Sequence, residues 1–533
     1  MTASATATAL GFSWRAPAVS LLFLATFDLA ARPVGAATCE SLATLTLPDT
    51  TITLAKVEPA GTFNPPRPHP GYMFGGSVDN LPEFCRVAAE TKPTKDSDIK
   101  FEVWMPVSGW NGKFMGEGNG GWSGEIWYHP MGAALRRGYV TASTDTGHEG
   151  DGGLASFALG HPEKVIDFGY RAVHEMTVKA KAIIAAFYGA DALKHSYWSG
   201  CSSGGRQGLK EAQRFPHDYD GIIAGAPANF WTHLITSGIW IGQLTRENRG
   251  SYLPMEKYAV LHKAVLEACD ALDGVKDGVL ENPKRCHFDP KEVRCKGADG
   301  PECLTAAEVA AAKKIYSGPK NPRTGEQIFP GLEPGSENGW GFFAGGGRSD
   351  PNGVFEPPIV ASHYKYLVFR DPKWDYRTLN FDRDVALADK LDKGVINATN
   401  PNLKEFFAQG GRLLLYHGWD DPAIAPENTV NYYDSVVAAM GGASNVQNSM
   451  RLFMAPGMDH CGGGDGPSDF DGIAALEQWV EKGQAPDRIV AAHFQQNSGK
   501  PDRTRPLCPY PQVAKYKGSG SNDDASNFVC SKE

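Results

Sequence analysis

The feature that most constrains the fold is a single Gly-x-Ser-x-Gly motif, formed by Gly200, Ser202 and Gly204. A short run of strand-forming residues, 195–199, precedes the motif, and a helix-forming run, 209–214, follows it. A serine on a sharp, glycine-flanked turn between a strand and a helix is typical of a nucleophile elbow. The N-terminus of the helix behind such a serine favours the negative charge of a tetrahedral intermediate. We therefore predict that Ser202 is a nucleophile.

Glycine accounts for 61 of the 533 residues, so the motif by itself also fits an ordinary glycine-rich turn. Partners further along the chain separate the two interpretations, because a serine hydroxyl needs a base and the base needs an anion that fixes its tautomer. In α/β-hydrolases these groups follow the order serine, acid, histidine, each after a strand. That order predicts Ser202, Asp421 and His460. Asp420 is an alternative acid, less favoured because the Asp-Pro turn leaves the strand at Asp421.

Strand-like and helix-like runs alternate in residues 38–228 and again in 400–533, which favours a parallel sheet covered by helices. The intervening residues 229–399 are rich in proline, glycine and aromatic residues, and we interpret them as an inserted lid domain. The predicted fold is thus an α/β-hydrolase fold with a large lid, and the tail after Pro501 is expected to be irregular. The predicted strands are 101–105, 113–116, 139–143, 195–199, 220–226, 412–416 and 450–454, and the predicted helices are 173–187, 209–214, 403–409 and 471–482.

The N-terminal residues 1–37 have the layout of a signal peptide. Arg15 precedes the apolar run 18–27, and small residues follow up to Ala36 and Ala37, where we expect cleavage. The apolar run is too short for a permanent membrane span, and no later segment is long and apolar enough. The mature protein is therefore expected to be secreted or periplasmic, with no membrane partner.

The net charge of −9 and the lack of basic clusters argue against a nucleic-acid partner. The oligomeric state is not predicted. Ten cysteines follow the expected cleavage site, and an even number in an exported chain predicts five disulfides. No pair has the C-x-x-C spacing of a thiolate metal site. A cysteine hydrolase that uses Cys201 would require a free thiol, which the even count disfavours.

Within the segment 269–281, the eight residues 270–277 contain three carboxylates, Asp270, Asp273 and Asp277, and a glycine follows each of the last two. Oxygen ligands at this density suit a hard cation such as Ca²⁺. The spacing of these carboxylates differs from that of an EF-hand. The alternative interpretation is a solvated acidic turn.

Three segments resemble the tannase and feruloyl esterase family of α/β-hydrolases, which includes mono(2-hydroxyethyl) terephthalate hydrolases. They are 197–207, the turn His417-Gly418-x-x-Asp421, and Asp459-His460-Cys461. The resemblance covers essentially the whole mature chain. Its most specific mark is a disulfide between a cysteine directly before the nucleophile and another directly after the histidine, and Cys201 and Cys461 fill those places.

The resemblance implies further site residues. It assigns the oxyanion hole to two backbone N–H groups. One is that of Ser203, as expected for the residue after the nucleophile. The other belongs to the loop Asn119-Gly120-Gly121, where Gly120 and Gly121 are both candidates. It implies a structural Ca²⁺ in the lid, with no organic cofactor. The implied Ca²⁺ ligands are Asp270, Asp273, Asp277 and the carbonyls of Val275 and Val279. The implied disulfides, besides Cys201–Cys461, are Cys39–Cys85, Cys269–Cys286, Cys295–Cys303 and Cys508–Cys530.

The expected function is that of a serine carboxylic-ester hydrolase that cleaves esters of aromatic acids through an acyl-enzyme. The acid is expected to be a hydroxycinnamate or a gallate, and one alternative is activity like that of a mono(2-hydroxyethyl) terephthalate hydrolase. A second alternative is a non-catalytic binding protein on a hydrolase scaffold. Several aromatic residues are candidates either for an acyl pocket or for the core: Trp122, Trp340, Phe342, Phe343 and Trp419.

Overall fold

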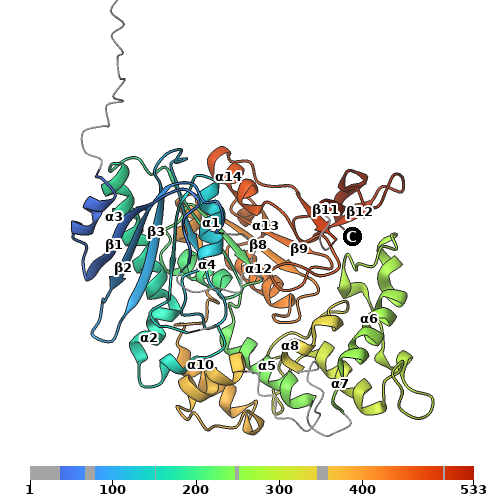
Figure 1. Ribbon diagram of the computed structural model, residues 1–533. Helices are drawn as coiled ribbons and strands as arrows, with labels where there is room; N and C mark the ends of the chain where they lie inside the picture. Colours follow the sequence, from blue (N-terminus) through green and yellow to red (C-terminus); the bar gives the residue numbers. More distant parts are fainter. Residues whose placement is uncertain are drawn as a thin grey trace, which may run out of the picture. The chain divides into compact units, whose positions relative to one another are not determined.

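The computed structural model describes residues 37–65, 78–150, 152–245, 251–344, 358–495 and 499–532. Within them, the central element is a nine-stranded sheet of order β1-β2-β3-β5-β4-β6-β7-β8-β9 (Figure 1). The predicted signal peptide lies outside the described residues, except for Ala37. The strands are β1 (Thr50–Glu58), β2 (Phe84–Thr91), β3 (Ile99–Pro106), β4 (Lys113–Glu117), β5 (Val140–Thr144), β6 (His195–Cys201), β7 (Gly221–Gly225), β8 (Arg412–Gly418) and β9 (Met450–Ala455).

The strands from β5 and β4 through β9 pair in parallel, whereas β1, β2 and β3 form an antiparallel extension. Parallel pairing brings the carboxyl ends of β4, β6, β8 and β9 to one edge of the sheet, where an α/β sheet binds its ligands. The predicted strands all occur, but the sequence prediction lacks β1 and β2. β1 and β2 lie in the antiparallel part of the sheet and contain both buried and partly exposed residues, so their apolar pattern is weaker than that of the fully buried strands β5 and β7.

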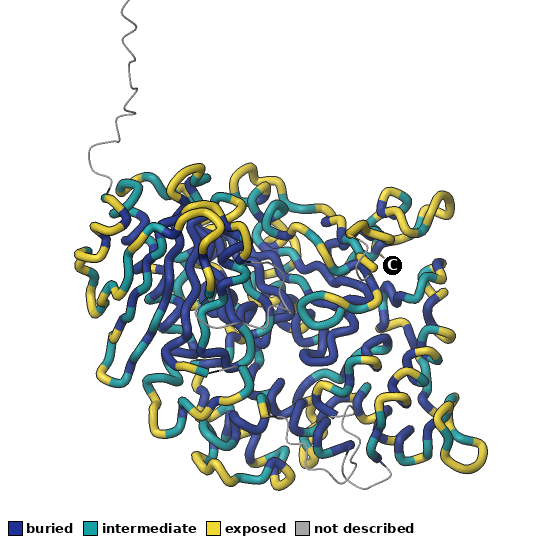
Figure 2. The backbone as a smooth tube through the Cα atoms, in the orientation of Figure 1, coloured by how far each residue is buried: buried dark blue, intermediate teal, exposed yellow. Residues whose placement is uncertain are grey.

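Helices cover both faces of the sheet, because successive strand residues point to opposite faces. One face packs Trp198 and Ile222 against α3 (Ala172–Tyr188), α4 (Ser203–Arg214) and α12 (Glu427–Ala439). The opposite face packs Tyr197 and Ile223 against α1 (Tyr128–Arg136) and α14 (Gly472–Lys482). Figure 2 shows the resulting layer of buried strands between partly exposed helices.

The segment between β7 and β8 corresponds to the predicted lid, and its helices lie below the sheet in Figure 1. They are α5 (Trp231–Leu244), α6 (Met255–Cys269), α7 (Ala306–Ser317), α8 (Gly341–Ala344), α9 (Pro358–Ser362) and α10 (Arg383–Asp392), whereas α11 (Lys404–Ala408) follows residue 399, the end of the predicted lid. The apolar core of these helices also includes Trp122 and Phe168, which precede β7 in the chain. Residues 37–533 accordingly form one compact unit.

The remaining elements are α2 (Pro162–Ile166), α13 (Ala443–Val446), and two small sheets that pair β10 (Ile489–Phe494) with β11 (Pro501–Leu507) and β12 (Gln512–Tyr516) with β13 (Phe528–Lys532). The expectation of an irregular tail is therefore wrong. The strands after Pro501 mix polar and apolar residues, and the disulfide Cys508–Cys530 links the residue that follows β11 to β13. Among the described residues, no helix has both the length and the apolar character needed to cross a bilayer.

Candidate active site

Ser202 occupies the turn between β6, which ends at Cys201, and α4, which begins at Ser203. Its backbone angles are φ 61° and ψ −122°, a region that side-chain-bearing residues rarely adopt. The N–H of Ser202 donates to the carbonyl oxygen of Gly225 at 3.0 Å, which anchors the turn to β7. At Gly200, a Cβ atom would lie 2.5 Å from the carbonyl carbon of Gly204, so glycine is required there. The motif therefore forms a strained elbow.

Asp421 forms a hydrogen bond with His460, 39 residues further along the chain. The Nδ1 atom of His460 lies 2.6 Å from the Oδ2 atom of Asp421, whose side chain is fully buried. The other carboxylate oxygen accepts the backbone N–H groups of Ala423 at 2.8 Å and Ile424 at 2.9 Å. A proton held on Nδ1 leaves the Nε2 atom of His460 as the basic position of the ring.

A second histidine, His417, also binds Asp421. Its Nε2 atom lies 3.0 Å from the Oδ2 atom of Asp421, and its Nδ1 atom lies 2.7 Å from the hydroxyl of Thr429. Burial opposes ionisation of Asp421, but the charge of His460 and the hydrogen bonds from both histidines outweigh it. The pKa of Asp421 is therefore held well below its usual value of 3.8. Sequence reasoning missed this role of His417, although its position four residues before Asp421 was a usable signal.

Asp420, the alternative acid, faces a different environment. Its side chain is buried, and its Oδ1 atom has no hydrogen-bond partner among the described residues. Burial, and then the negative charges of Glu337 and Asp459, raise the pKa of Asp420 well above 3.8. Among the described residues, His460 pairs with Asp421 and makes no hydrogen bond with Asp420, so the geometry favours Asp421.

The loop after β4 lies against the N-terminus of α4. A Cβ atom at Gly118 would lie 2.6 Å from the Cα atom of Gly204. Gln207 accepts the backbone N–H of Asn119 at 3.2 Å and donates to the side-chain oxygen of Asn119 at 2.8 Å. These contacts fix the loop beside the elbow.

The three candidates for the oxyanion hole lie at this junction. The Ser203 hydroxyl donates to the carbonyl oxygen of Gly121 at 2.8 Å. Its backbone N–H is in the first turn of α4, where N–H groups have no partner within the helix. The N–H groups of Gly120 and Gly121 donate to no other described residue. Both glycines therefore remain candidates beside Ser203.

The five implied disulfides are confirmed: Cys39–Cys85, Cys201–Cys461, Cys269–Cys286, Cys295–Cys303 and Cys508–Cys530. The bond between Cys201 and Cys461 connects the residue before Ser202 to the residue after His460, with 5.9 Å between the Cα atoms. Because Cys201 is bonded, the alternative of a cysteine nucleophile is wrong.

A cavity of about 810 Å³ lies beside the elbow. Its lining includes His460, Cys201 and the aromatic side chains of Trp127, Phe342 and Phe470. Of the five aromatic residues proposed from the sequence, only Phe342 is among the lining residues of this cavity, and it is 46% exposed. The other four are buried in the core: Trp122, Trp340, Phe343 and Trp419.

The acidic loop, residues 269–281, is compact. Asp270 accepts the backbone N–H groups of Asp277 at 3.1 Å and Gly278 at 3.0 Å, and Asp273 accepts that of Val275 at 2.8 Å. Burial raises the pKa of Asp273 to about 6.

Asp277 has two different oxygens in this loop. One forms an ion pair with Arg505, and the other, Oδ1, is buried and has no partner among the described residues. The carboxylate oxygens of the three aspartates do not all lie within 4.8 Å of one another. A bound cation would therefore have to draw these oxygens closer together.

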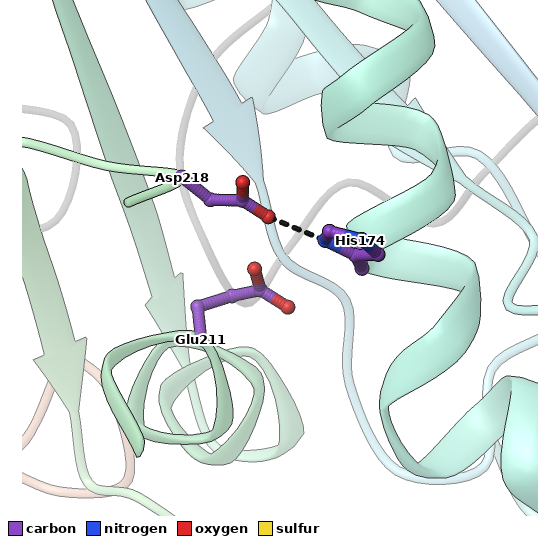
Figure 3. A group of neighbouring side chains, drawn as sticks. All are labelled: His174, Glu211 and Asp218. Carbon is purple, nitrogen blue, oxygen red and sulfur yellow. Dashed lines mark hydrogen bonds and ion pairs between the residues drawn. The ribbon is translucent and has the colours of Figure 1, made fainter. Parts of the chain in front are cut away.

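One group of described His, Cys, Asp and Glu residues has its ligand atoms within 4.8 Å of one another: His174, Glu211 and Asp218 (Figure 3). The Nδ1 atom of His174 lies 2.6 Å from the carboxylate of Asp218. Burial and the neighbouring Asp218 raise the pKa of Glu211 well above 4.5. Lys181 already supplies a cation here, because it donates to the carbonyl oxygen of Asp218. A protonated Glu211 can share its proton with Asp218, so we assign no metal to this group.

Comparison with known proteins gives consistent matches. The family model described as "Tannase and feruloyl esterase" matches residues 85–531. A protein named "Uncharacterized esterase" from Xanthomonas campestris pv. campestris is 40% identical, over 93% of this chain and 91% of that protein. A protein named "Probable feruloyl esterase B-2" from Neosartorya fischeri is 34% identical, over 96% of this chain and 98% of that protein.

Solved structures show the same similarity. Feruloyl esterase B from Aspergillus oryzae aligns with a TM-score of 0.84 and 31% identity, covering 92% of this chain and 99% of that chain. Tannin acyl hydrolase from Aspergillus niger aligns with a TM-score of 0.77 and 21% identity, covering 92% and 93%, a likeness of fold alone. These alignments confirm the predicted α/β-hydrolase fold.

Proposed function

Because the chain belongs to the tannase and feruloyl esterase family and is thus a carboxylic ester hydrolase, we propose that it cleaves esters of aromatic acids through a serine acyl-enzyme. The observation that carries this proposal is the strained elbow at Ser202 together with the hydrogen bond between His460 and Asp421. These are the groups that a serine hydrolase requires.

In the proposed mechanism, the Nε2 atom of His460 takes the proton of the Ser202 hydroxyl, and the Oγ atom attacks the ester carbonyl. The N–H of Ser203, with that of Gly120 or Gly121, stabilises the oxyanion of the tetrahedral intermediate. Collapse of the intermediate breaks the bond to the alcohol, which receives the proton from His460. Water, activated by the same histidine, then releases the acid.

The proposed acid is a hydroxycinnamate or a gallate, because a relative and an aligned structure are named feruloyl esterase and the matching family is described as tannase and feruloyl esterase. A terephthalate half-ester is a second candidate acid. An assay of methyl ferulate, chlorogenate, methyl gallate and a terephthalate monoester tests the choice. Failure to cleave all four, together with no reaction of Ser202 with a phosphonate probe, would support a non-catalytic binding protein instead.

We propose that the protein is secreted or periplasmic. The predicted signal peptide and the five disulfides support export, because disulfides persist in oxidising compartments. Mass spectrometry of the mature N-terminus tests this proposal, and we expect it to begin at or next to Ala37.

We also propose that the acidic loop of the lid binds Ca²⁺. The ligands would be Asp270, Asp273, Asp277 and the carbonyl oxygens of Val275 and Val279. The unpaired, buried Oδ1 atom of Asp277 supports the proposal, since a buried carboxylate oxygen without a donor is costly unless a cation binds it. When bound, the cation would neutralise the repulsion among the three aspartates.

Chelation should therefore lower the melting temperature, by roughly 5 °C if Ca²⁺ is present well above its dissociation constant. Asp273→Asn should abolish this dependence on Ca²⁺. Asp289→Asn, at a partly exposed aspartate eight residues after this segment that pairs with Lys313, should leave it intact. An unchanged melting curve after exhaustive chelation, with no calcium in elemental analysis, would exclude the site.

Breaking the disulfide between Cys201 and Cys461 should reduce kcat more than it reduces stability. Its ends lie 260 residues apart, and the chain-entropy model gives it about 5 kcal/mol at most. The bond positions both the elbow and the histidine loop, and a shift of about 1 Å can cost ~10²-fold in rate. We expect Cys201→Ser, Cys461→Ser and the double variant to lose similar amounts of kcat.

The matched control is the disulfide Cys295–Cys303, which closes a short loop in the lid. Removing it should change kcat little. If Cys461→Ser remained fully active while Cys201→Ser did not, the two cysteines would not act through a shared bond.

A further inference from the structure

Glu117, the last residue of β4, is a buried carboxyl group without a partner. It is 6% exposed, and no described residue donates a hydrogen bond to its side chain. It lines the cavity of about 810 Å³ that also contains His460. A buried polar group is normally paired, so an unpaired carboxyl facing a cavity indicates a partner that comes from solution.

The alternation of β4 explains why this side chain faces the cavity. Phe114 packs on the face of the sheet that carries α3 and α4, and Met115 packs on the opposite face. Glu117 is two residues after Met115 and therefore shares its face. The parallel register places Glu117 beside Ser199, two residues before Cys201. The carboxyl thus lies next to the strand that ends in the elbow.

The lining of the cavity around Glu117 combines aromatic side chains with a few polar ones, among them Asp459, His460, Asp469 and His493. Trp127, Phe342, Tyr416 and Phe470 line it, and no Lys or Arg does. Burial raises the pKa of Glu117 to about 8. The carboxyl is therefore mostly protonated at neutral pH, when it can both donate a hydrogen bond and accept one. A hydroxyl group has the same two capacities, so the two are complementary.

We propose that Glu117 is a specificity residue that binds a hydroxyl group of the ester substrate. This inference rests on the proposed function and deepens it, because it names a chemical group that the substrate must carry. The hydroxyl could belong to the aromatic ring of the acid or to a polyol alcohol. In either case the aromatic lining packs against the carbon skeleton, and Glu117 supplies the directional contact.

Two pairs of esters separate these sources. Methyl caffeate and methyl cinnamate differ in the ring hydroxyls, and chlorogenate and methyl caffeate share the acid but differ in the alcohol. Glu117→Leu should lower kcat/KM roughly 10- to 100-fold for the hydroxylated member of one pair and much less for its partner. The affected pair identifies the source of the hydroxyl.

Two further measurements distinguish substrate binding by Glu117 from a purely structural role of this side chain. Glu117→Leu should raise the melting temperature, because an unpaired buried carboxyl is replaced by an apolar group. Glu117→Gln should restore most of the discrimination, since an amide also donates and accepts. The control Glu211→Gln replaces the carboxyl of another buried glutamate by an amide, on α4 and outside the cavity lining, and should keep the discrimination of the wild type.

Equal losses on all three esters, or no loss on any, would overturn the inference while the wild type remains active. A wild type that cleaves none of the three would instead contradict the proposed function, and this inference with it.

Discussion

Ser202→Ala should lower kcat/KM for aromatic esters by about 10⁴-fold or more, because the variant has no nucleophile and retains only the oxyanion hole and binding contacts. The melting temperature should change little. The change removes one partly exposed oxygen, and no side-chain hydrogen bond of Ser202 is present among the described residues. Steady-state hydrolysis of methyl ferulate and a thermal melt measure the two effects.

The matched control is Ser203→Ala, one residue further along the chain. It removes the hydroxyl that donates to Gly121 but keeps the backbone N–H proposed for the oxyanion hole. We expect a loss of no more than roughly 10-fold. An inactive Ser203→Ala beside an active Ser202→Ala would show that the nucleophile is assigned to the wrong residue.

Asp421→Asn should lower kcat about 10⁴-fold with a small change in KM. An amide can donate to the Nδ1 atom of His460, which places the ring proton on Nε2 and removes the base that Ser202 needs. Asp420→Asn is the control, because Asp420 makes no hydrogen bond to His460 among the described residues, and burial already opposes its ionised form by raising its pKa. If Asp420→Asn were the inactive variant, the proposed acid would be wrong.

The same substitution should change the dependence of stability on pH. The pKa of Asp421 lies well below 3.8 in the folded protein, so its ionised form stabilises the fold above pH 3.8. That contribution is lost as the pH falls below 3.8 towards the folded-state pKa. Asp421→Asn should therefore lose less stability on acidification than the wild type, as measured by melting temperature against pH.

Local pattern and chain order determined much of the architecture. The glycines around Ser202, the run before them and the helix after them specify a tight strand–turn–helix unit, which depends on short-range sterics. Alternating apolar runs predicted the central parallel strands, since fully buried strands have strong signals. The same reasoning failed for β1, β2 and the strands after Pro501, where half-exposed residues and a disulfide, rather than apolar burial, define the pairing.

The tertiary structure alone decided which side chains meet. Asp420 and Asp421 are adjacent in sequence, yet the turn after β8 directs one to His460 and leaves the other unpaired, because neighbouring residues point in different directions. Glu117 gains its importance from a cavity whose walls come from other segments of the chain. Sequence spacing carries no information about such contacts, since they depend on how separate strands are aligned in the sheet.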